Sequence, residues 1–282
     1  MKQISYQKEQ ATLYLVPTPI GNKADMTNRC CEVLQCVDII ACEDKRVSVK
    51  LLDSLGVHKP LMVNQKFNED SNVETFMQLL DEGKSIALIS DAGMPCISDP
   101  GYTIVYQLVN KGYNVVPLPG ANAALTALMA SGIDSARFTF VGFLPANKSG
   151  REKELTLLKD RSETLIFYEA VHRIMETLRS MLEVLGDRNV CVARELTKLH
   201  ETIYRGKFSE IIEQMDVKGE YVIVVEGNSE VNKESTSIDV TTCIKLLLDE
   251  GISVKSASKV AAALTGIPKN QCYQMASEFN KS

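Results

Sequence analysis

Residues 85–123 read SIALISDAGMPCISDPGYTIVYQLVNKGYNVVPLPGANA, and this stretch decides the fold class. It opens with Ser85–Ser90, an apolar run of the length of a buried strand. A loop rich in Gly, Pro and Asp follows, and then a helical pattern over Tyr102–Asn110. A second strand over Asn114–Leu118 leads into an apolar helix over Ala121–Ala130. Strands and helices that alternate through short connections predict a parallel sheet covered by helices.

The same alternation runs through the rest of the first half. Leu13–Val16 predicts a strand that Pro17 and Pro19 end, because proline has no N–H to donate to a neighbouring strand. Ser71 is expected to cap the N-terminus of a helix over Val73–Glu82. The other predicted elements are strands over Asp38–Ala41 and Leu61–Val63 and helices over Asn28–Cys36 and Val47–Leu55. The first half therefore predicts an α/β fold with a mainly parallel sheet.

The second half has a different spacing. Asn189–Ala193 and Glu201–Arg205 are strand patterns with no helix between them, so they are expected to pair as a hairpin. This predicts a second, mixed sheet. Its other predicted elements are strands over Arg137–Phe143, Thr164–Tyr168 and Tyr221–Val225 and helices over Lys153–Lys159, Ile174–Leu185 and Ser209–Met215.

Four segments are expected along the chain. Residues 1–123 are expected to form an N-terminal α/β domain, and residues 124–227 a second α/β domain. Residues 228–238 are polar and rich in Ser and Thr, which is typical of a linker. Residues 239–282 predict a small helical segment at the C-terminus.

Composition excludes several classes of protein. The chain has 282 residues, of which 45% are hydrophobic and 24% charged, so a mostly disordered chain is excluded. No apolar run approaches the roughly 18–20 residues that a membrane span needs, and the polar N-terminus does not resemble a signal peptide. These features predict a cytoplasmic protein. The eight cysteines form no C-x-x-C pair and the three histidines have no i,i+4 partner, so no metal site is expected, and the thiols are expected to be reduced and mostly buried.

The net charge of −5 gives the whole chain no attraction for nucleic acid. Any RNA partner must therefore be held by a local basic surface. Residues 251–282 carry four lysines against one glutamate. They predict either an RNA-binding surface or a solvated helical face.

The loops that follow four predicted strands are rich in Gly, Pro or carboxylate residues. Ligands of open parallel sheets bind beyond the carboxyl ends of the strands, so these loops predict one site. They contain neither G-x-G-x-x-G nor G-x-x-x-x-G-K-[ST], so the sequence does not support a dinucleotide-binding site or a P-loop. Carboxylates with exposed carbonyls suit a cation or ribose hydroxyls better than a phosphate. The loops are Pro17–Asn22, Cys42–Arg46, Asp91–Gly101 and Pro119–Ala123.

Several charged residues in these loops have two interpretations. Asp91 and Asp99 flank a tight loop, where each could instead cap a helix or a turn. The sequence Glu43-Asp44-x-Arg46 could be an ion pair at a helix N-terminus. In the second half, His172 follows a predicted strand and could be a helix-start hydrogen bonder or a catalytic group.

Seven motifs occur in one order and resemble the tetrapyrrole methylase superfamily. The resemblance covers about residues 13–227, and a segment similar to the family's C-terminal tail follows. Within the superfamily the motifs are most similar to those of enzymes that methylate the ribose 2′-hydroxyl of a cytidine in 16S ribosomal RNA. The motifs are LYLVPTPIGN, CEDKR, SDAGMPCISDPGY, PLPG, FYEAVHR, ARELTK and GEYVIVVEG.

The resemblance implies two α/β domains with S-adenosylmethionine in the cleft between them, usually in a homodimer, and an RNA substrate in 16S ribosomal RNA or the small ribosomal subunit. It also implies the cofactor-binding residues, among which Gly120 is expected to let the ligand approach the backbone. These residues are Pro17, Asp91, Ala92, Gly93, Met94, Cys96, Ile97, Ser98, Pro119, Gly120, Asn122, Ala123, Tyr168, Leu196 and Glu220.

The catalytic group is expected among the acids and bases of the loops. Glu43, Asp44, Glu169 and His172 are the candidates for a general base that takes the hydroxyl proton. Arg46, Arg173 and Arg194 would hold a phosphate or orient an acid.

Two alternatives remain open. A tetrapyrrole carbon could be the methyl acceptor, because other members of the superfamily act on porphyrinoids. The chain could also be an RNA-binding protein without catalytic activity, because Lys45, Met94 and Cys96 depart from the family's usual residues.

Overall fold

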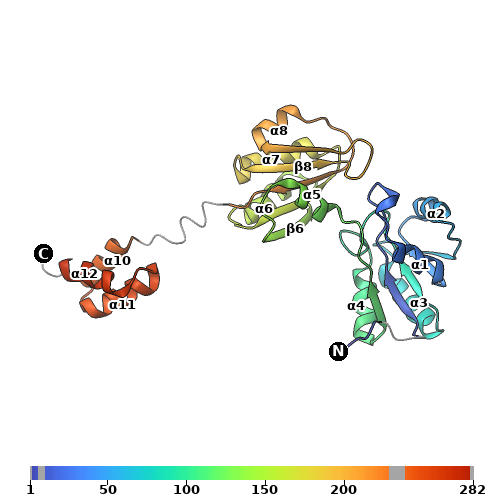
Figure 1. Cartoon of the computed structure of the whole chain (residues 1–282), viewed down its shortest axis with the longest axis horizontal. Helices are drawn as coiled ribbons and strands as arrows, with labels where there is room; N and C mark the ends of the chain where they lie inside the picture. The colour runs from blue at the N-terminus through green and yellow to red at the C-terminus, as the bar shows by residue number, and fades with distance from the viewer. Residues whose placement is uncertain (1, 6–9, 229–238, 280–282) are drawn as a thin grey trace. The chain divides into compact units, whose positions relative to one another are not determined.

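A computed structural model describes residues 2–5, 10–228 and 239–279. The chain, drawn in Figure 1, divides into two compact units. The first comprises Met1–Thr156 and Thr164–Glu226, and the second comprises Leu157–Glu163 and Gly227–Ser282. The boundaries expected at residues 123 and 227 stay predictions, and almost all of the expected linker lies outside the described residues.

The first unit begins with a five-stranded sheet whose pairs are all parallel, as the sequence predicts. The strand order is β3-β2-β4-β1-β5. Each strand is three or four residues long; β4 is buried throughout, whereas the edge strand β3 is only half-buried. The strands are β1 (Thr12–Leu15), β2 (Ile39–Cys42), β3 (Leu61–Val63), β4 (Ile86–Leu88) and β5 (Asn114–Pro117).

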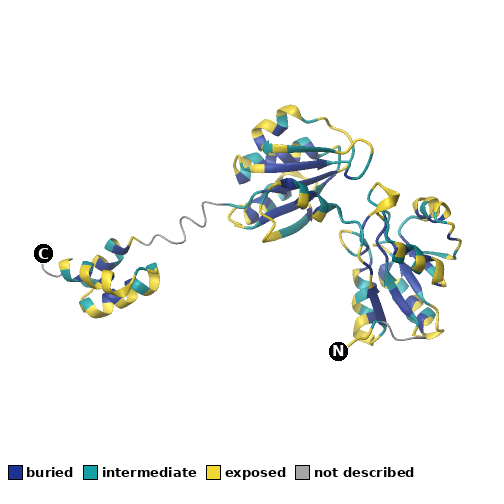
Figure 2. Ribbon diagram, in the orientation of Figure 1, coloured by how far each residue is buried: buried dark blue, intermediate teal, exposed yellow. Residues whose placement is uncertain are grey.

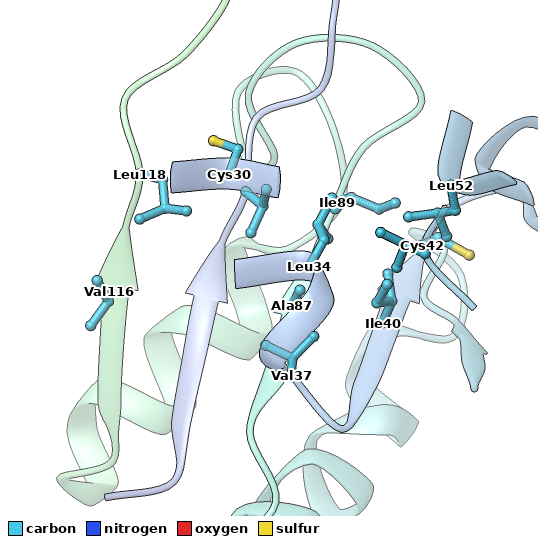
Figure 3. Close-up of a cluster of buried hydrophobic side chains, with 12 residues drawn as sticks. Cys30, Leu34, Val37, Ile40, Cys42, Leu52, Ala87, Ile89, Val116 and Leu118 are labelled. Carbon is cyan, nitrogen blue, oxygen red and sulfur yellow. The ribbon is translucent and has the colours of Figure 1, made fainter. Parts of the chain in front are cut away.

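Helices cover both faces of this sheet. Buried strands between helices with exposed outer faces are visible in Figure 2. On one face, α1 (Asn28–Cys36) and α2 (Lys45–Ser54) place Leu34 and Leu52 against Ile40 of β2, in the cluster that Figure 3 shows. On the other face, α3 (Glu69–Asp81) and α4 (Tyr102–Lys111) pack buried apolar side chains against alternate strand residues. A short 3-10 helix, Lys23–Asp25, follows β1.

The prediction that Ser71 caps α3 is wrong. Asn68 is the N-cap, and Ser71 lies inside the first turn, where its hydroxyl donates to the Asn68 carbonyl. The helix begins at Glu69, four residues before its predicted start, and Glu69 makes a contact with a second helix that stabilises the added turn. Its buried carboxylate accepts the amide of Thr103 at 2.6 Å, and so caps the N-terminus of α4, whose own N-cap is a glycine.

The second sheet is mixed, as predicted, with the order β6-β7-β10-β8-β9. β6 and β7 are parallel, whereas the other pairs, including the predicted hairpin, are antiparallel. α5 (Ala123–Ser131) packs on one face against Ile166, Cys191 and Val224. The strands are β6 (Phe138–Phe143), β7 (Thr164–Glu169), β8 (Asn189–Arg194), β9 (Thr202–Lys207) and β10 (Tyr221–Val225).

Three further helices belong to this half: α6 (Lys148–Leu158), α7 (Ile174–Leu185) and α8 (Phe208–Gln214). α6 begins five residues before its predicted start. The side chain of Asn147 accepts the amide of Gly150, which caps the added turn. Arg151 in that turn is 2% exposed and donates to the Ser180 hydroxyl of α7. A basic residue thus occupies a core position. The sequence around Arg151 does not indicate this, because buried positions are predicted from apolar residues.

The described residues of the second unit form the helices α10 (Val240–Asp249), α11 (Val254–Thr265) and α12 (Lys269–Phe279). They share a small core of their own, which includes Ile244, Ala261 and Cys272. This confirms the predicted helical segment. No helix within the described ranges is long and apolar enough to cross a membrane.

All eight cysteines are free thiols. Four are buried and Cys36 is exposed, so burial is less general than predicted. Across residues 2–5, 10–228 and 239–279, no three His, Cys, Asp or Glu side chains are grouped to hold a metal ion.

Candidate functional site

The strand order places a crevice between β1 and β4. From β1 the chain crosses towards β2, whereas from β4 it crosses in the opposite direction towards β5. The loops after these two adjacent strands therefore diverge, which is where open α/β sheets bind ligands. A backbone bridge fixes the two loops: Thr18 N–H donates to Gly93 C=O at 2.9 Å, and Gly93 N–H returns a bond at 3.1 Å.

A cavity of about 310 Å³ lies at these loops. Its second wall is the edge of the second sheet where β7 and β8 end and β10 begins, because Tyr221 pairs with both Glu169 and Arg194. The lining residues are Ile20, Asp91, Ala92, Gly93, Met94, Ile97, Ser98, Asp99, Asn122, Ala123, Phe143, Tyr168, Glu169, Ala170, Ala193, Glu195, Leu196, Lys198, Glu220, Tyr221 and Val222.

Carboxylates give one wall of the cavity a negative potential. Burial, with the neighbouring Glu43 carboxylate next in importance, raises the pKa of Asp99 to about 6. Burial also raises the pKa of Asp91 and of Glu43, and the Asp91 charge adds to the shift at Glu43. A cation in the cavity would relieve this repulsion.

Tyr168 forms the aromatic part of the wall. Its hydroxyl accepts the amide of Ala124, in the first turn of α5, at 3.3 Å. The rings of Phe140 and Phe143 pack edge-on against it, with centroid distances of 4.9 and 5.7 Å. Burial raises the pKa of the Tyr168 hydroxyl, so it stays protonated at neutral pH.

The two loops that face each other across the cavity have strained backbones. Cys96 and Ser98 lie in the left-handed region with φ of 69° and 66°. Glu195 and Thr197, after β8, have φ of 52° and 66°. Such conformations cost about 1–3 kcal/mol each and gather at functional sites.

Most of the predicted cofactor residues are brought together. Eleven of them line the cavity: Asp91, Ala92, Gly93, Met94, Ile97, Ser98, Asn122, Ala123, Tyr168, Leu196 and Glu220.

Pro17, Cys96, Pro119 and Gly120 lie outside this lining. The expected role of Gly120 needs correction, because its φ is not positive and the space beside it belongs to another residue. A Cβ atom there would stand 2.4 Å from the Cβ of Pro17. Gly120 therefore allows two loops to pack, and a Gly120→Val protein would not keep this loop arrangement.

Of the predicted catalytic residues, Glu169 alone lines the cavity. Its carboxylate accepts the Thr177 hydroxyl at 2.5 Å and the Ala170 amide at 2.8 Å, and pairs with Arg173 at 3.3 Å. These contacts occupy a carboxylate whose side chain is 1% exposed. These contacts stabilise the fold around Glu169, and its catalytic role stays a prediction.

The other predicted catalytic residues lie apart from the lining. Asp44 caps α2 and forms an exposed ion pair with Arg46 at 2.6 Å, which is the ion-pair interpretation of that motif. The Arg46 guanidinium, the largest cause, holds the pKa of Asp44 at about 2. His172 is exposed, and Glu43 is half-buried near Asp99 and Asp91, where burial and then these neighbouring charges raise the pKa values of Glu43 and Asp99. Arg194 donates to the Lys218 carbonyl.

Glu195, Lys198 and Phe143 are lining residues that sequence reasoning missed. The Lys198 ammonium lies 2.9 Å from both the Glu195 and the Glu220 carboxylates. Glu195 and Lys198 belong to the ARELTK motif, which was the available signal. Phe143 ends a predicted strand and had no such signal.

The cavity fits S-adenosylmethionine, the methyl donor that this fold implies. Half-buried carboxylates with raised pKa values suit a sulfonium and an ammonium group. The N-terminus of α5 suits a carboxylate, because the first amides of a helix lack internal partners. Ile20, Met94 and Leu196 supply apolar surface for a base.

Comparisons with known proteins agree with this fit. Residues 12–212 match the family described as Tetrapyrrole (Corrin/Porphyrin) Methylases, and residues 234–279 match the RsmI C-terminal HTH domain. Two solved structures share the fold at low identity. The uroporphyrin-III-C-methyltransferase of Thermus thermophilus has a TM-score of 0.55 and 18% identity, and covers 80% of this chain and 98% of its own. A diphthine synthase has a TM-score of 0.61 and 13% identity, with 79% and 94% covered.

The chain therefore belongs to the tetrapyrrole methylase family. Its curated relatives include the ribosomal RNA small subunit methyltransferase I of Bacillus subtilis, which is 46% identical and covers 96% of this chain and 97% of the relative. The protein of that name from Escherichia coli O157:H7 is 44% identical, with 97% of each chain covered.

Proposed function

We propose that the chain transfers the methyl group of S-adenosylmethionine to the 2′-hydroxyl of a cytidine ribose in 16S ribosomal RNA. The observation that carries this proposal is the 46% identity, over nearly the full length, to a protein named ribosomal RNA small subunit methyltransferase I. The cavity with its acidic wall supports the same conclusion, because it suits a cationic cofactor. The helix-turn-helix match at residues 234–279 supports a nucleic-acid substrate.

The residues of the cavity have three tasks. S-adenosylmethionine, when bound, supplies an electrophilic methyl carbon on a sulfonium. The Asp99 and Asp91 carboxylates balance positive charge, and the apolar wall of Ile20, Tyr168 and Leu196 excludes water from the reacting atoms. The third task is alignment. Holding the oxygen nucleophile in line with the methyl carbon supplies most of the acceleration of methyl transfer.

Asp99 is the best placed group for the proton of the hydroxyl. It belongs to the cavity wall, and its pKa of about 6 lies close to neutral pH. A base with a pKa near the working pH is the most effective. Among the four bases named from the sequence, Glu169 and Asp44 are occupied by neighbouring groups.

The test is a methyl-transfer assay with 30S subunits from a strain that lacks this enzyme. Replacing the methylated nucleotide by its 2′-deoxy form in reconstituted subunits should abolish transfer but not binding, because phosphate contacts supply most of the affinity. Methylation that survives the deoxy substitution would place the methyl group on the base and contradict the proposal. Transfer to a porphyrinoid and to no RNA would support tetrapyrrole methylation instead.

We also propose a cytoplasmic homodimer. A ribosomal substrate implies the cytoplasm, and the resemblance implies the dimer. Leu125 and Met129 on α5 are exposed apolar side chains of the kind that oligomer interfaces cover. Light scattering that gives the mass of a monomer would contradict the dimer.

A further inference from the structure

We propose that Phe143 is the platform on which the base of the acceptor nucleotide stacks during methyl transfer. The inference rests on the proposed function, and deepens it by naming a positioning residue for the substrate. It depends on the exposure of this ring, on a bulge that aims it, and on contacts that hold it in place.

Phe143 is an exposed aromatic ring at the cavity. It lines the cavity and is 55% exposed. Of the two tyrosines in the lining, Tyr168 is half-buried and Tyr221 is buried. An apolar ring left in water lacks the stabilisation that burial would give. A ligand with a flat apolar face would recover it.

A β-bulge aims the ring at this place. Side chains alternate along a strand, so Phe140 and Phe143 would normally point to opposite faces of the sheet. The pairing of β6 with β7 shifts between Phe140 and Gly142, so that Phe140 pairs with Ile166 and Phe143 with Tyr168. One extra residue brings both rings to the face of Tyr168, and bulges of this kind re-aim side chains beside active sites.

The segment after Phe143 is held firmly. Arg173 donates to the Leu144 carbonyl at 2.6 Å, and the buried Arg151 donates to the Ala146 carbonyl at 3.2 Å. On the strand side, a Cβ atom on Gly142 would stand 3.4 Å from the Ser98 hydroxyl, so Phe143 follows a residue that touches the loop after β4. A rigid support lowers the entropy cost when a ligand stacks on the ring.

A nucleobase is the occupant that the chemistry favours. Bases of single-stranded RNA stack on aromatic side chains, and an enzyme that modifies a nucleotide takes it out of the helical stack. Stacking tolerates every base, so Phe143 would position the nucleotide, and sequence would be read elsewhere. Phe143 meets Tyr168 in a T-shaped arrangement with 65° between the rings, and more than half of Phe143 stays open to a ligand.

The chain contains no tryptophan, so the Phe143→Trp protein has a single indole at the cavity. Titration with a cytidine-rich single-stranded oligoribonucleotide, in the presence of S-adenosylhomocysteine, should quench its fluorescence. Phe138→Trp is the matched control, because Phe138 begins the same strand, is 42% exposed and lies outside the lining. Its indole should not be quenched.

Kinetics test the same assignment. Phe143→Ala should lower kcat/KM for 30S subunits by about 5-fold to 150-fold, the range measured when a stacking ring is removed. Its calorimetric affinity for S-adenosylmethionine and its unfolding temperature should match those of the unchanged protein. Phe143→Trp should restore transfer, and Phe143→Leu should not.

Three results would overturn the assignment: full transfer by Phe143→Ala, equal rescue by leucine and tryptophan, or a fall in cofactor affinity as large as the fall in transfer. The last would place the cofactor on the ring. Absence of RNA methylation by the unchanged protein is a different result, which contradicts the proposed function itself.

Discussion

The Cγ atom of Lys198 lies 2.6 Å from the point where a Cβ atom on Gly21 would stand. The Thr197 hydroxyl lies equally close to that point, and donation from the Asn22 amide to this hydroxyl, at 2.9 Å, joins the same two loops. The loop after β1 therefore reaches the loop after β8 only because residue 21 is glycine. Both loops contribute lining residues to the cavity.

Gly21→Ala should separate these loops and weaken the binding of S-adenosylmethionine, measured by calorimetry. Crowding at a packed position costs about 1–3 kcal/mol of unfolding free energy. Gly83→Ala is the matched control. Gly83 follows α3 with φ of +80°, so alanine strains the backbone there, but no neighbouring atom lies within 4 Å of the added Cβ. We expect the control to lose stability and keep its cofactor affinity. Equal affinities for both variants would show that the packing at Gly21 does not shape the cavity.

Glu169→Gln should lower stability far more than it changes chemistry. The amide leaves Arg173 without its buried carboxylate, and breaking such a pair costs on the order of 3 kcal/mol. Denaturant unfolding measures this decrease. Glu183→Gln, on the exposed side of α7, should leave the unfolding midpoint nearly unchanged. A Glu169→Gln protein as stable as the control, with transfer abolished, would restore Glu169 as a catalytic group.

The pKa of Asp99 predicts how cofactor binding depends on pH. With a pKa of about 6, Asp99 is ionised at pH 7.5 and mostly protonated at pH 5. As the pH is lowered from 7.5 to 5, affinity for the cationic S-adenosylmethionine should therefore fall more steeply than affinity for the neutral S-adenosylhomocysteine. Asp99→Asn should remove the difference in slope. Parallel slopes for the two ligands in the unchanged protein would contradict a role for this carboxylate in balancing the sulfonium.

The same shift has a consequence for stability without ligand. The pKa of Asp99 is raised from 3.8 to about 6 by burial and the neighbouring carboxylates, so between these values the folded state binds more protons. Stability from this group therefore falls as pH rises from about 4 to 6. Thermal unfolding should show Asp99→Asn to be more stable than the unchanged protein at pH 7.5, and the gap should close towards pH 4. A destabilised variant at pH 7.5 would mean that a favourable partner outweighs the repulsion.

Lysines of the second unit should contribute to RNA affinity. Lys255 and Lys259 are exposed one turn apart on α11, and Lys269 begins α12. Changing all three to alanine should weaken RNA binding and reduce its log–log salt slope by about 0.7 for each single-strand phosphate that is no longer neutralised. Cofactor affinity should not change. A triple alanine variant at Lys50, Lys84 and Lys111 removes the same charge from the first unit, and an equal effect there would favour the solvated-face interpretation.

The sequence predicted the elements well because their signals are local. Apolar periodicity, Gly at helix ends and Pro after strands act over a few residues, and α1, α7, β3 and β10 have the predicted bounds. The two largest errors have non-local causes. α3 begins early because Glu69 caps α4, and α6 begins early where Arg151 is buried against α7.

By itself the sequence determined the α/β class, the mixed second sheet, the helical C-terminus and the loops in which a site would form, because strand ends and turn residues are written in short stretches of chain. The tertiary structure alone decided which groups in those loops meet. It occupied Glu169 with Thr177 and Arg173, left Asp44 at a helix cap, and brought Asp99 and Phe143 to the cavity. The reason is physical: the protonation and exposure of a side chain depend on neighbours that are distant in the sequence, and only packing brings those neighbours together.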